Sequence, residues 1–167
     1  SLCVAKGNLV ASTPAAIPVL QHAPSGRYVC HISLLNDEDT LPYLRQPFLL
    51  FSENDKKVPY SSHFWHYVRH NEQGDSALIL VGSACKDVTL FCDKFANGKL
   101  VDSRRVAFTD SVVRLQLDYH PSYGESARLC CAFLKEGKMY AFETDIKKPV
   151  PEKKLLLKWE TFRSHLN

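Results

Sequence analysis

The sequence has no apolar stretch long enough to cross a membrane as a helix. Such a helix needs roughly 18 to 20 consecutive apolar residues, and polar or charged residues interrupt every apolar run of this chain well before that length. The amino end also lacks the basic and then apolar pattern of a signal peptide. Because the sequence opens on Ser1, we expect a segment of a larger protein whose targeting signal lies elsewhere.

A strong charge of one sign is missing as well. The chain carries 21 Lys and Arg against 18 Asp and Glu, a net charge of +3. Its basic residues are interspersed with acidic ones; Arg104 and Arg105, for example, lie between Asp102 and Asp110. Proteins that bind nucleic acid usually present a concentrated basic face with aromatic stacking partners. We therefore predict no nucleic acid partner and no membrane insertion by this segment.

No Cys-x-x-Cys pair is present among the six cysteines. Their even number allows a disulfide framework with about 15 connectivities, but a 167-residue chain with 45% apolar residues is large enough to build a core without such cross-links. Cys30, Cys92 and Cys131 fall on inward faces of predicted strands, and we interpret them as buried free thiols. The six are Cys3, Cys30, Cys85, Cys92, Cys130 and Cys131.

Helical spacing of apolar residues is almost absent, whereas alternation with a period of two is frequent. Residues 112–119 place apolar side chains at every second position, and residues 27–35 and 87–95 do the same. This pattern is typical of half-buried strands. Further strand candidates are residues 8–12, 16–20, 47–51, 77–84 and 155–162.

Two Gly-containing turns connect neighbouring strand candidates. Asn97-Gly98 and Glu136-Gly137 each supply the positive φ that a tight hairpin requires. The second turn joins residues 129–133 to residues 140–146, which alternate in the same way. Short strands separated by turns predict an all-β fold, an Ig-like antiparallel β-sandwich.

Proline-bearing polar segments suggest two boundaries, at residues 52–62 and 147–154. Residues 56–149 are then predicted to form one β-sandwich. Residues 1–55 hold too few strand candidates for a second sandwich and are interpreted as closing strands of a preceding module. Residues 150–167 are interpreted as a connector and the first strand of a following module.

Three histidines, at positions 63, 66 and 70, raise the question of a zinc site. A zinc ion needs three or four converging ligands, and His66 and His70 would meet only on a helix. The apolar run that follows indicates an extended backbone, on which they lie roughly 13 Å apart. We predict no metal and no cofactor. Phe64, Trp65 and Tyr67 are expected to cover a sandwich edge or an interdomain seam, with the histidines facing solvent.

Other chemical candidates are explained more simply without catalysis. Ser25-Gly26 lacks the Gly-x-Ser-x-Gly context of a nucleophile elbow and indicates a turn. The acidic run at positions 37 to 39 is interpreted as solvated charge, with calcium binding as the alternative. Trp65 and Trp159 are the two tryptophans, and inward packing is favoured over sugar stacking. We predict no catalytic residue and no enzyme.

Residues 123–167 hold a series of landmarks that begins with Tyr123-Gly124, the Gly137 hairpin and the connector Pro149 to Pro151. With these landmarks the segment resembles the macroglobulin-type domains of bacterial alpha-2-macroglobulin-like proteins. Residues 23–37 and 47–59 resemble closing strands of such a module, and residues 77–95 resemble opening strands. The remaining landmarks are Leu155, Leu157, Trp159, Thr161, Phe162 and Arg163.

The resemblance implies one module in a string within an extracytoplasmic protein, in the periplasm or at the cell surface. Members of that family trap proteases that cut an exposed bait segment. This chain lacks the Cys-Gly-Glu-Gln thioester of many members. The implied function is a non-catalytic structural module, whose partners are neighbouring domains and, by resemblance, proteases; the alternative is a cell-surface adhesin or glycan-binding module. Lys56 and Lys57 would be protease-accessible, in a bait segment or in a plain tether.

Overall fold

The computed structural model describes residues 3–8, 10, 17–35 and 40–151, and in this part of the chain it is built of antiparallel strands. The all-β prediction is confirmed. None of the helices described is long and apolar enough to span a membrane. The strands are β1 (Gly26–Leu35), β2 (Thr40–Leu50), β3 (Trp65–His70), β4 (Ser76–Ser83), β5 (Val88–Ala96), β6 (Lys99–Phe108), β7 (Ser111–Asp118), β8 (Ser126–Lys135) and β9 (Lys138–Lys147).

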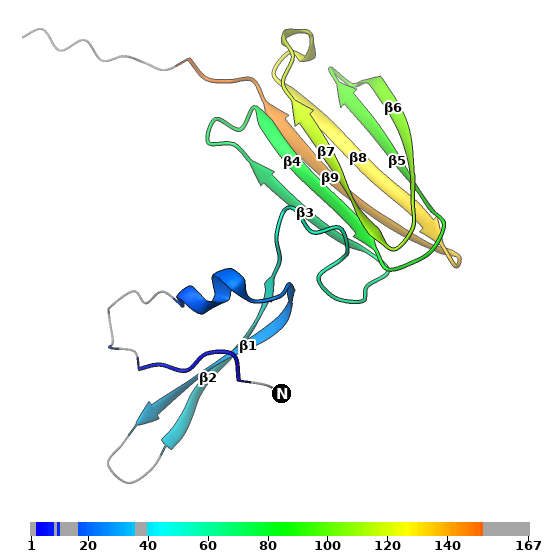
Figure 1. The fold of residues 1–167 in the computed structure, drawn as a ribbon. Helices are drawn as coiled ribbons and strands as arrows, with labels where there is room; N and C mark the ends of the chain where they lie inside the picture. Colours follow the sequence, from blue (N-terminus) through cyan, green and yellow to red (C-terminus); the bar gives the residue numbers. More distant parts are fainter. Residues whose placement is uncertain (1–2, 9, 11–16, 36–39, 152–167) are drawn as a thin grey trace, which may run out of the picture.

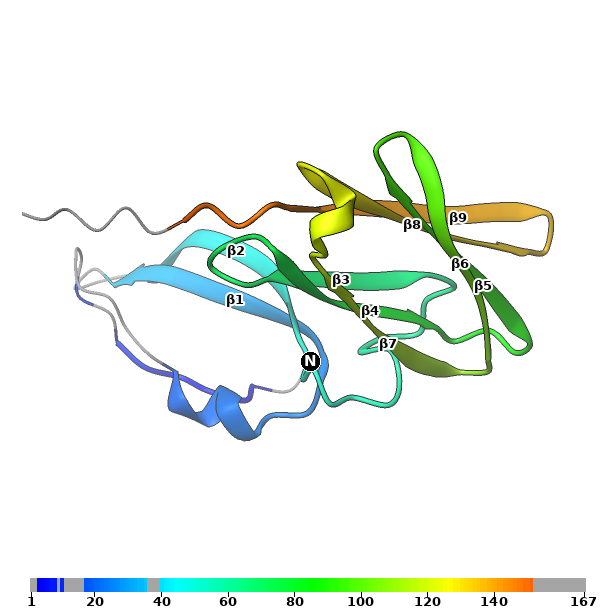
Figure 2. The same cartoon turned by 90° about the horizontal axis from the view of Figure 1, so that it is seen from above.

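Strands β3 to β9 form the predicted β-sandwich (Figure 1). One sheet has the order β3-β4-β7, and the other has the order β6-β5-β8-β9. In the view of Figure 2, β8 and β9 of the second sheet lie above β3 and β4 of the first. The pairing of β5 with β8 joins segments that are far apart in the sequence, so the second sheet needs long-range contacts to form.

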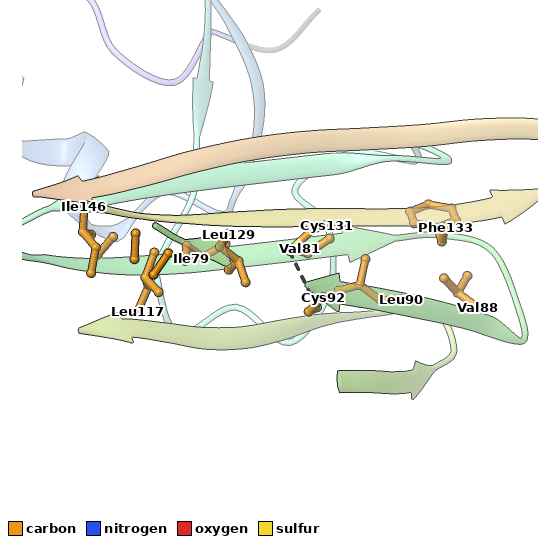
Figure 3. Packing of buried hydrophobic residues seen from close by; sticks show 13 residues of the cluster. Ile79, Val81, Val88, Leu90, Cys92, Leu117, Leu129, Cys131, Phe133 and Ile146 are labelled. Carbon is orange, nitrogen blue, oxygen red and sulfur yellow. Dashed lines mark hydrogen bonds between the residues drawn. The ribbon is translucent and has the colours of Figure 1, made fainter. Parts of the chain in front are cut away.

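The core fills the space between these sheets (Figure 3). It is made by the inward positions of alternating strands. Val88, Leu90 and Cys92 of β5 share the inner face of their sheet with Leu129 and other residues of the neighbouring strand β8. Strand β4 is buried on both faces, as its unbroken apolar sequence predicts. The fully buried side chains include Ile79, Val81, Leu90, Leu117, Phe133 and Ile146.

Both predicted hairpin turns are confirmed. Asn97 and Gly98 have φ angles of 51° and 70°, and Glu136 and Gly137 have φ angles of 50° and 73°. Two successive positive φ angles match the right-handed twist of the strands that they join. They fix the registers of β5 with β6 and of β8 with β9.

Strands β1 and β2 form a separate two-stranded ribbon. Along β1, Tyr28, Cys30 and Ile32 are half-buried while Val29 and His31 are exposed, so the predicted alternation holds but full burial of Cys30 does not. A ribbon of two strands has no second layer to enclose an inward face.

The predicted strand at residues 16–20 is wrong. A 3-10 helix, η1 (Pro18–His22), lies there instead, with proline at its first turn. Proline lacks the backbone N–H that a strand ladder needs, and its fixed φ suits the start of a helix. The predicted strand at 155–162 and part of the one at 8–12 lie outside the described residues. The division into 1–55, 56–149 and 150–167 stays a prediction.

Candidate functional site at the two faces of strand β3

Strand β3 is an edge strand of its sheet, and its two faces have different partners. Trp65 and Tyr67 point to the outer face of the sandwich and join the cluster described next. His66 and His70 point the opposite way and contact strand β9 of the other sheet. Because successive side chains of a strand alternate, the sequence WHYVRH supplies both faces at once.

The outer face carries a second apolar cluster, which we call the aromatic seam. It joins the ribbon and the segment after it to the sandwich. Trp65, at 6% exposure, and Leu80, at 1%, are its most enclosed members together with Leu78. The half-buried members are Leu49, Phe51, Val58, Tyr60, Tyr67 and Val112.

Phe51 is the central contact of the aromatic seam. Its ring centroid lies 5.2 Å from that of Trp65 at 76° and 4.7 Å from that of Tyr67 at 68°. Both pairs have the edge-to-face geometry that aromatic quadrupoles favour, worth about 0.5 to 1.5 kcal/mol per pair beyond the area buried. Phe64, Trp65 and Tyr67 were expected to cover a sandwich edge or an interdomain seam. Trp65 and Tyr67 lie in this cluster on an edge strand, whereas Phe64 packs against the core; that the cluster separates two domains stays a prediction.

Polar contacts surround the aromatic seam. Arg69 of β3 donates to the carboxylate of Glu53 at 3.0 Å, and this hydrogen bond lowers the pKa of Glu53. Arg114 of β7 donates to the backbone carbonyl of Glu53 at 3.2 Å. On the ribbon side, the guanidinium of Arg27 lies 3.9 Å from the ring centre of Tyr60. These exposed contacts orient the segment between β2 and β3, but they contribute little to the free energy of folding.

Lys56 and Lys57 lie in a segment that is attached to the sandwich. The backbone N–H of Val112 donates to the carbonyl of Lys56 at 2.9 Å. Lys57 forms an ion pair with Asp110 at 2.6 Å, although its side chain is 71% exposed. A protease binds its substrate in extended form, so this segment must detach from the sandwich before it can be cut. The accessibility of the two lysines to proteases stays a prediction, and it depends on how often the segment detaches.

Gly82 of β4 allows the segment to approach the sheet closely. A Cβ atom at this position would lie 2.6 Å from Cγ1 of Val58 and 3.0 Å from Cγ2 of Val112. Neither distance is compatible with van der Waals contact. The only residue type that fits without displacing Val58 is therefore glycine.

The inner face of β3 forms what we call the histidine edge, where all three predicted histidines contact strand β9 or its neighbours. His63 Nδ1 lies 3.2 Å from the hydroxyl of Tyr140. The ring of His66 stacks on Phe142 at 4.5 Å and 10°. His70 Nε2 donates to the carbonyl of Asp145 at 2.9 Å.

The structure bears on two expectations about these histidines. All three are exposed, as expected, and each also contacts a residue of β9 in the other sheet. The backbone of β3 is extended, as the argument against a shared zinc ion requires. In the described part of the chain, no group of three His, Cys, Asp or Glu residues converges as a metal site would.

Stacking also changes the proton affinity of His66. Desolvation by the surrounding protein lowers the pKa of this imidazole from its usual 6.5. Its ring lies between Phe142 and Phe64, whose centroid is 5.2 Å away. Burial against apolar rings disfavours the charged form because imidazolium loses hydration there. The histidine edge is therefore most stable with His66 neutral.

The other candidates from the sequence do not assemble into a reactive group. Ser25 Oγ donates to the carboxylate of Asp55 at 2.6 Å and so closes the base of the ribbon. Among the described residues, no contact places a histidine or another general base beside Ser25. Asp37, Glu38 and Asp39 lie outside the described residues, and so does Trp159.

Two cysteines form a contact that sequence reasoning missed. Cys92 and Cys131 are buried as predicted, but their sulfur atoms also lie 3.6 Å apart. Hydrogen bonding to Cys92, together with burial, raises the pKa of Cys131. Cys130 is half-buried and points to the opposite face, as predicted for neighbours on a strand. The signal that could have found the pair is the shared inward face of both strands, but only the β5–β8 register makes them direct neighbours.

Comparison with known proteins gives no family. No family model matches the chain, and no curated protein matches it. Among solved structures it is similar to the rat CD45 extracellular region, domains d3-d4, with a TM-score of 0.32 and 13% sequence identity, over 87% of this chain and 76% of that one. A likeness at this level carries no argument about function.

Proposed function

We propose that this chain is a non-catalytic, extracytoplasmic structural module of an alpha-2-macroglobulin-like protein, and that it holds neighbouring modules in register during protease trapping. The observation that carries the proposal is the aromatic seam. It attaches the ribbon to the outer face of the sandwich through Phe51, Trp65 and Tyr67. A module that holds its neighbours in a fixed arrangement needs such an attachment, because contacts between domains are otherwise modest and allow relative motion.

The resemblance of the sequence to macroglobulin-type domains supports the family and the extracytoplasmic location. The ribbon supports a tandem arrangement, since two strands alone make a poor folding unit. Proteases enter the proposal by resemblance, and the segment around Lys56 and Lys57 is the place where they would act on this module. Its attachment by the seam means that cleavage there requires local opening.

Limited digestion with trypsin tests the attachment. In the wild type we expect slow cleavage after Lys56 and Lys57, because the segment must first detach. Phe51→Ala removes the central ring of the aromatic seam and should raise the rate of these two cleavages about tenfold or more, since cleavage follows the population of the open form. Mass spectrometry of the early fragments measures both rates.

Phe48→Ala is the matched control for this digestion. Phe48 lies on β2, three residues before Phe51, and stacks on Tyr28 of the ribbon at 5.7 Å instead of on the sandwich. It should leave the two cleavage rates near the wild-type values. If the wild type is cut first at Lys56 and Lys57, at the rate of Phe51→Ala, the aromatic seam does not hold the segment and the proposal fails.

A glycan-binding or adhesin module is the alternative function, and no described contact favours it. Its natural aromatic platform, Trp65, is only 6% exposed. Screening the chain against a glycan panel, with tryptophan fluorescence as the readout, separates the two functions. The proposed structural module gives no saturable binding; a saturable change in fluorescence would favour the adhesin.

A further inference from the structure

The second sheet has a pair of thiols at its centre. Strands β5 and β8 are the two inner strands of the order β6-β5-β8-β9, and Cys92 lies directly opposite Cys131 in their register. Both side chains point into the core, with exposures of 4% and 1%. Their sulfur atoms are 3.6 Å apart, and Figure 3 marks this contact with a dashed line.

This position meets the backbone condition for a disulfide. A disulfide requires Cα atoms about 4.4 to 6.8 Å apart. Directly opposite residues in antiparallel strands have Cα atoms about 4.5 or 5.5 Å apart, according to whether they exchange backbone hydrogen bonds. Either spacing lies inside the permitted range. The sulfur atoms already lie next to each other at 3.6 Å, and forming the bond shortens this distance to about 2.05 Å.

The fold leaves Cys92 no competing partner among its near neighbours. Cys130 is adjacent to Cys131 in sequence but points to the outer face of the sheet, where its cross-strand neighbours are Asp93 and Glu143. Cys85 follows strand β4 at the rim of the core. Cys92 and Cys131 are therefore the two thiols that the fold selects from six.

We propose that Cys92 and Cys131 are joined by a cross-strand disulfide when the chain folds in an oxidising compartment. The oxidant is a small-molecule or protein disulfide. The thiolate of one cysteine attacks it, forming a mixed disulfide and releasing one thiol. The second cysteine attacks that mixed disulfide, releasing the other thiol. Two S–H bonds are lost, one S–S bond forms, and the two electrons and two protons reduce the oxidant to two thiols.

Burial decides when this reaction takes place. In the folded sheet neither sulfur is accessible to an external disulfide, so the cross-link forms while the sheet is still open. Once the sandwich closes, the same burial protects the bond from reducing agents. The bond then closes a loop that contains the end of β5, all of β6 and β7 and the first half of β8, and it restricts the unfolded chain accordingly.

Peptide mapping tests the proposal on the whole chain. The reduced, unfolded protein is refolded in a buffer of oxidised and reduced glutathione, quenched with acid, alkylated in denaturant and digested with trypsin. We expect peptide 87–94, which holds Cys92, to be linked to peptide 129–135, which holds Cys130 and Cys131. Recovery of the two peptides unlinked and fully alkylated overturns the proposal.

Two neighbouring variants identify the partner. Cys130→Ser should preserve the linked peptides, whereas Cys131→Ser should abolish them. Linkage that survives in Cys131→Ser and disappears in Cys130→Ser overturns the assignment. Because Cys131→Ser changes the core, the wild type supplies a second measurement: refolding with glutathione should give a melting temperature about 10 °C or more above that after refolding in reductant. Equal melting temperatures contradict the cross-link.

Discussion

The core between the sheets and the aromatic seam outside them share strand β4 but are built differently. Ile79 and Val81 of β4 face the core, and Leu78 and Leu80 face the aromatic seam. The core consists mainly of aliphatic side chains that are fully enclosed by two sheets. The aromatic seam has three buried residues and a margin of half-buried ones, aromatic and aliphatic, several of which belong to the connecting segment. The core therefore determines whether the sandwich folds, and the seam determines whether the ribbon stays attached.

The largest effect is expected in the core. Leu90 is 0% exposed on the inner strand β5, so Leu90→Ala should lower the free energy of unfolding by about 2 to 5 kcal/mol, through lost burial and the cavity that remains. Urea denaturation measures the change. Phe91→Ala is the control, because the next residue is 43% exposed on the outer face. A comparable loss in both variants would contradict the assignment of the two faces.

The aromatic seam should respond to a single added methyl group. Gly82→Ala places a Cβ against Val58 and Val112 and should lower the free energy of unfolding by about 1 to 3 kcal/mol. Val58→Ala in the same chain removes the nearer clash, so the double variant should regain part of the loss. The same urea experiment applies. Purely additive losses would mean that Val58 does not lie against the sheet.

The histidine edge should make stability depend on pH. The pKa of His66 is lower in the folded chain than in the unfolded chain, so its contribution is complete above about pH 7. As the pH falls below the unfolded value of 6.5, the unfolded state takes up protons first, and stability decreases until the folded pKa is passed. Thermal melts at pH 7.5, 6.5 and 5.5 follow this decrease.

His66→Tyr provides the comparison for the pH series. Tyrosine retains a ring to stack on Phe142 but does not titrate in this range. The melting temperature of this variant should decrease less between pH 7.5 and 5.5 than that of the wild type. His31→Asn, on the exposed face of the ribbon, should show the same decrease as the wild type. An unchanged decrease in His66→Tyr would remove His66 from the explanation.

The smallest effect belongs to the ion pair beside the aromatic seam. Lys57 and Asp110 are 71% and 41% exposed, and solvent screens their attraction. Lys57→Ala should therefore change the free energy of unfolding by less than about 0.5 kcal/mol. A loss above 1 kcal/mol in urea denaturation would show that attachment is electrostatic and not mainly apolar.

The sequence predicted those parts of the fold that depend on neighbours along the chain. Alternation located β5, β7 and β8, and the turns at Gly98 and Gly137 fixed two hairpins, because a period of two and a positive φ are local properties. The segment around Pro18 was an exception among these local predictions. Its apolar residues suggested a strand, but Pro18 favours the start of a helix and a 3-10 helix forms there.

The candidate site was less predictable because it depends on which strands meet. Trp65 was expected at a sandwich edge or an interdomain seam, but its partner Phe51 lies beyond a loop, and no local pattern connects the two. The contact of His70 with Asp145 and the opposition of Cys92 to Cys131 require the sheet order as well. These are long-range pairings, which periodicity does not encode.

Nitrogen-15 relaxation of the backbone amides tests the central claim most directly, namely that the aromatic seam attaches the ribbon to the sandwich. Amides of β1 and β2 and amides of β3 to β9 should give one rotational correlation time in the wild type. In Phe51→Ala the ribbon should give a shorter one. A ribbon that already tumbles faster than the sandwich in the wild type would contradict the account.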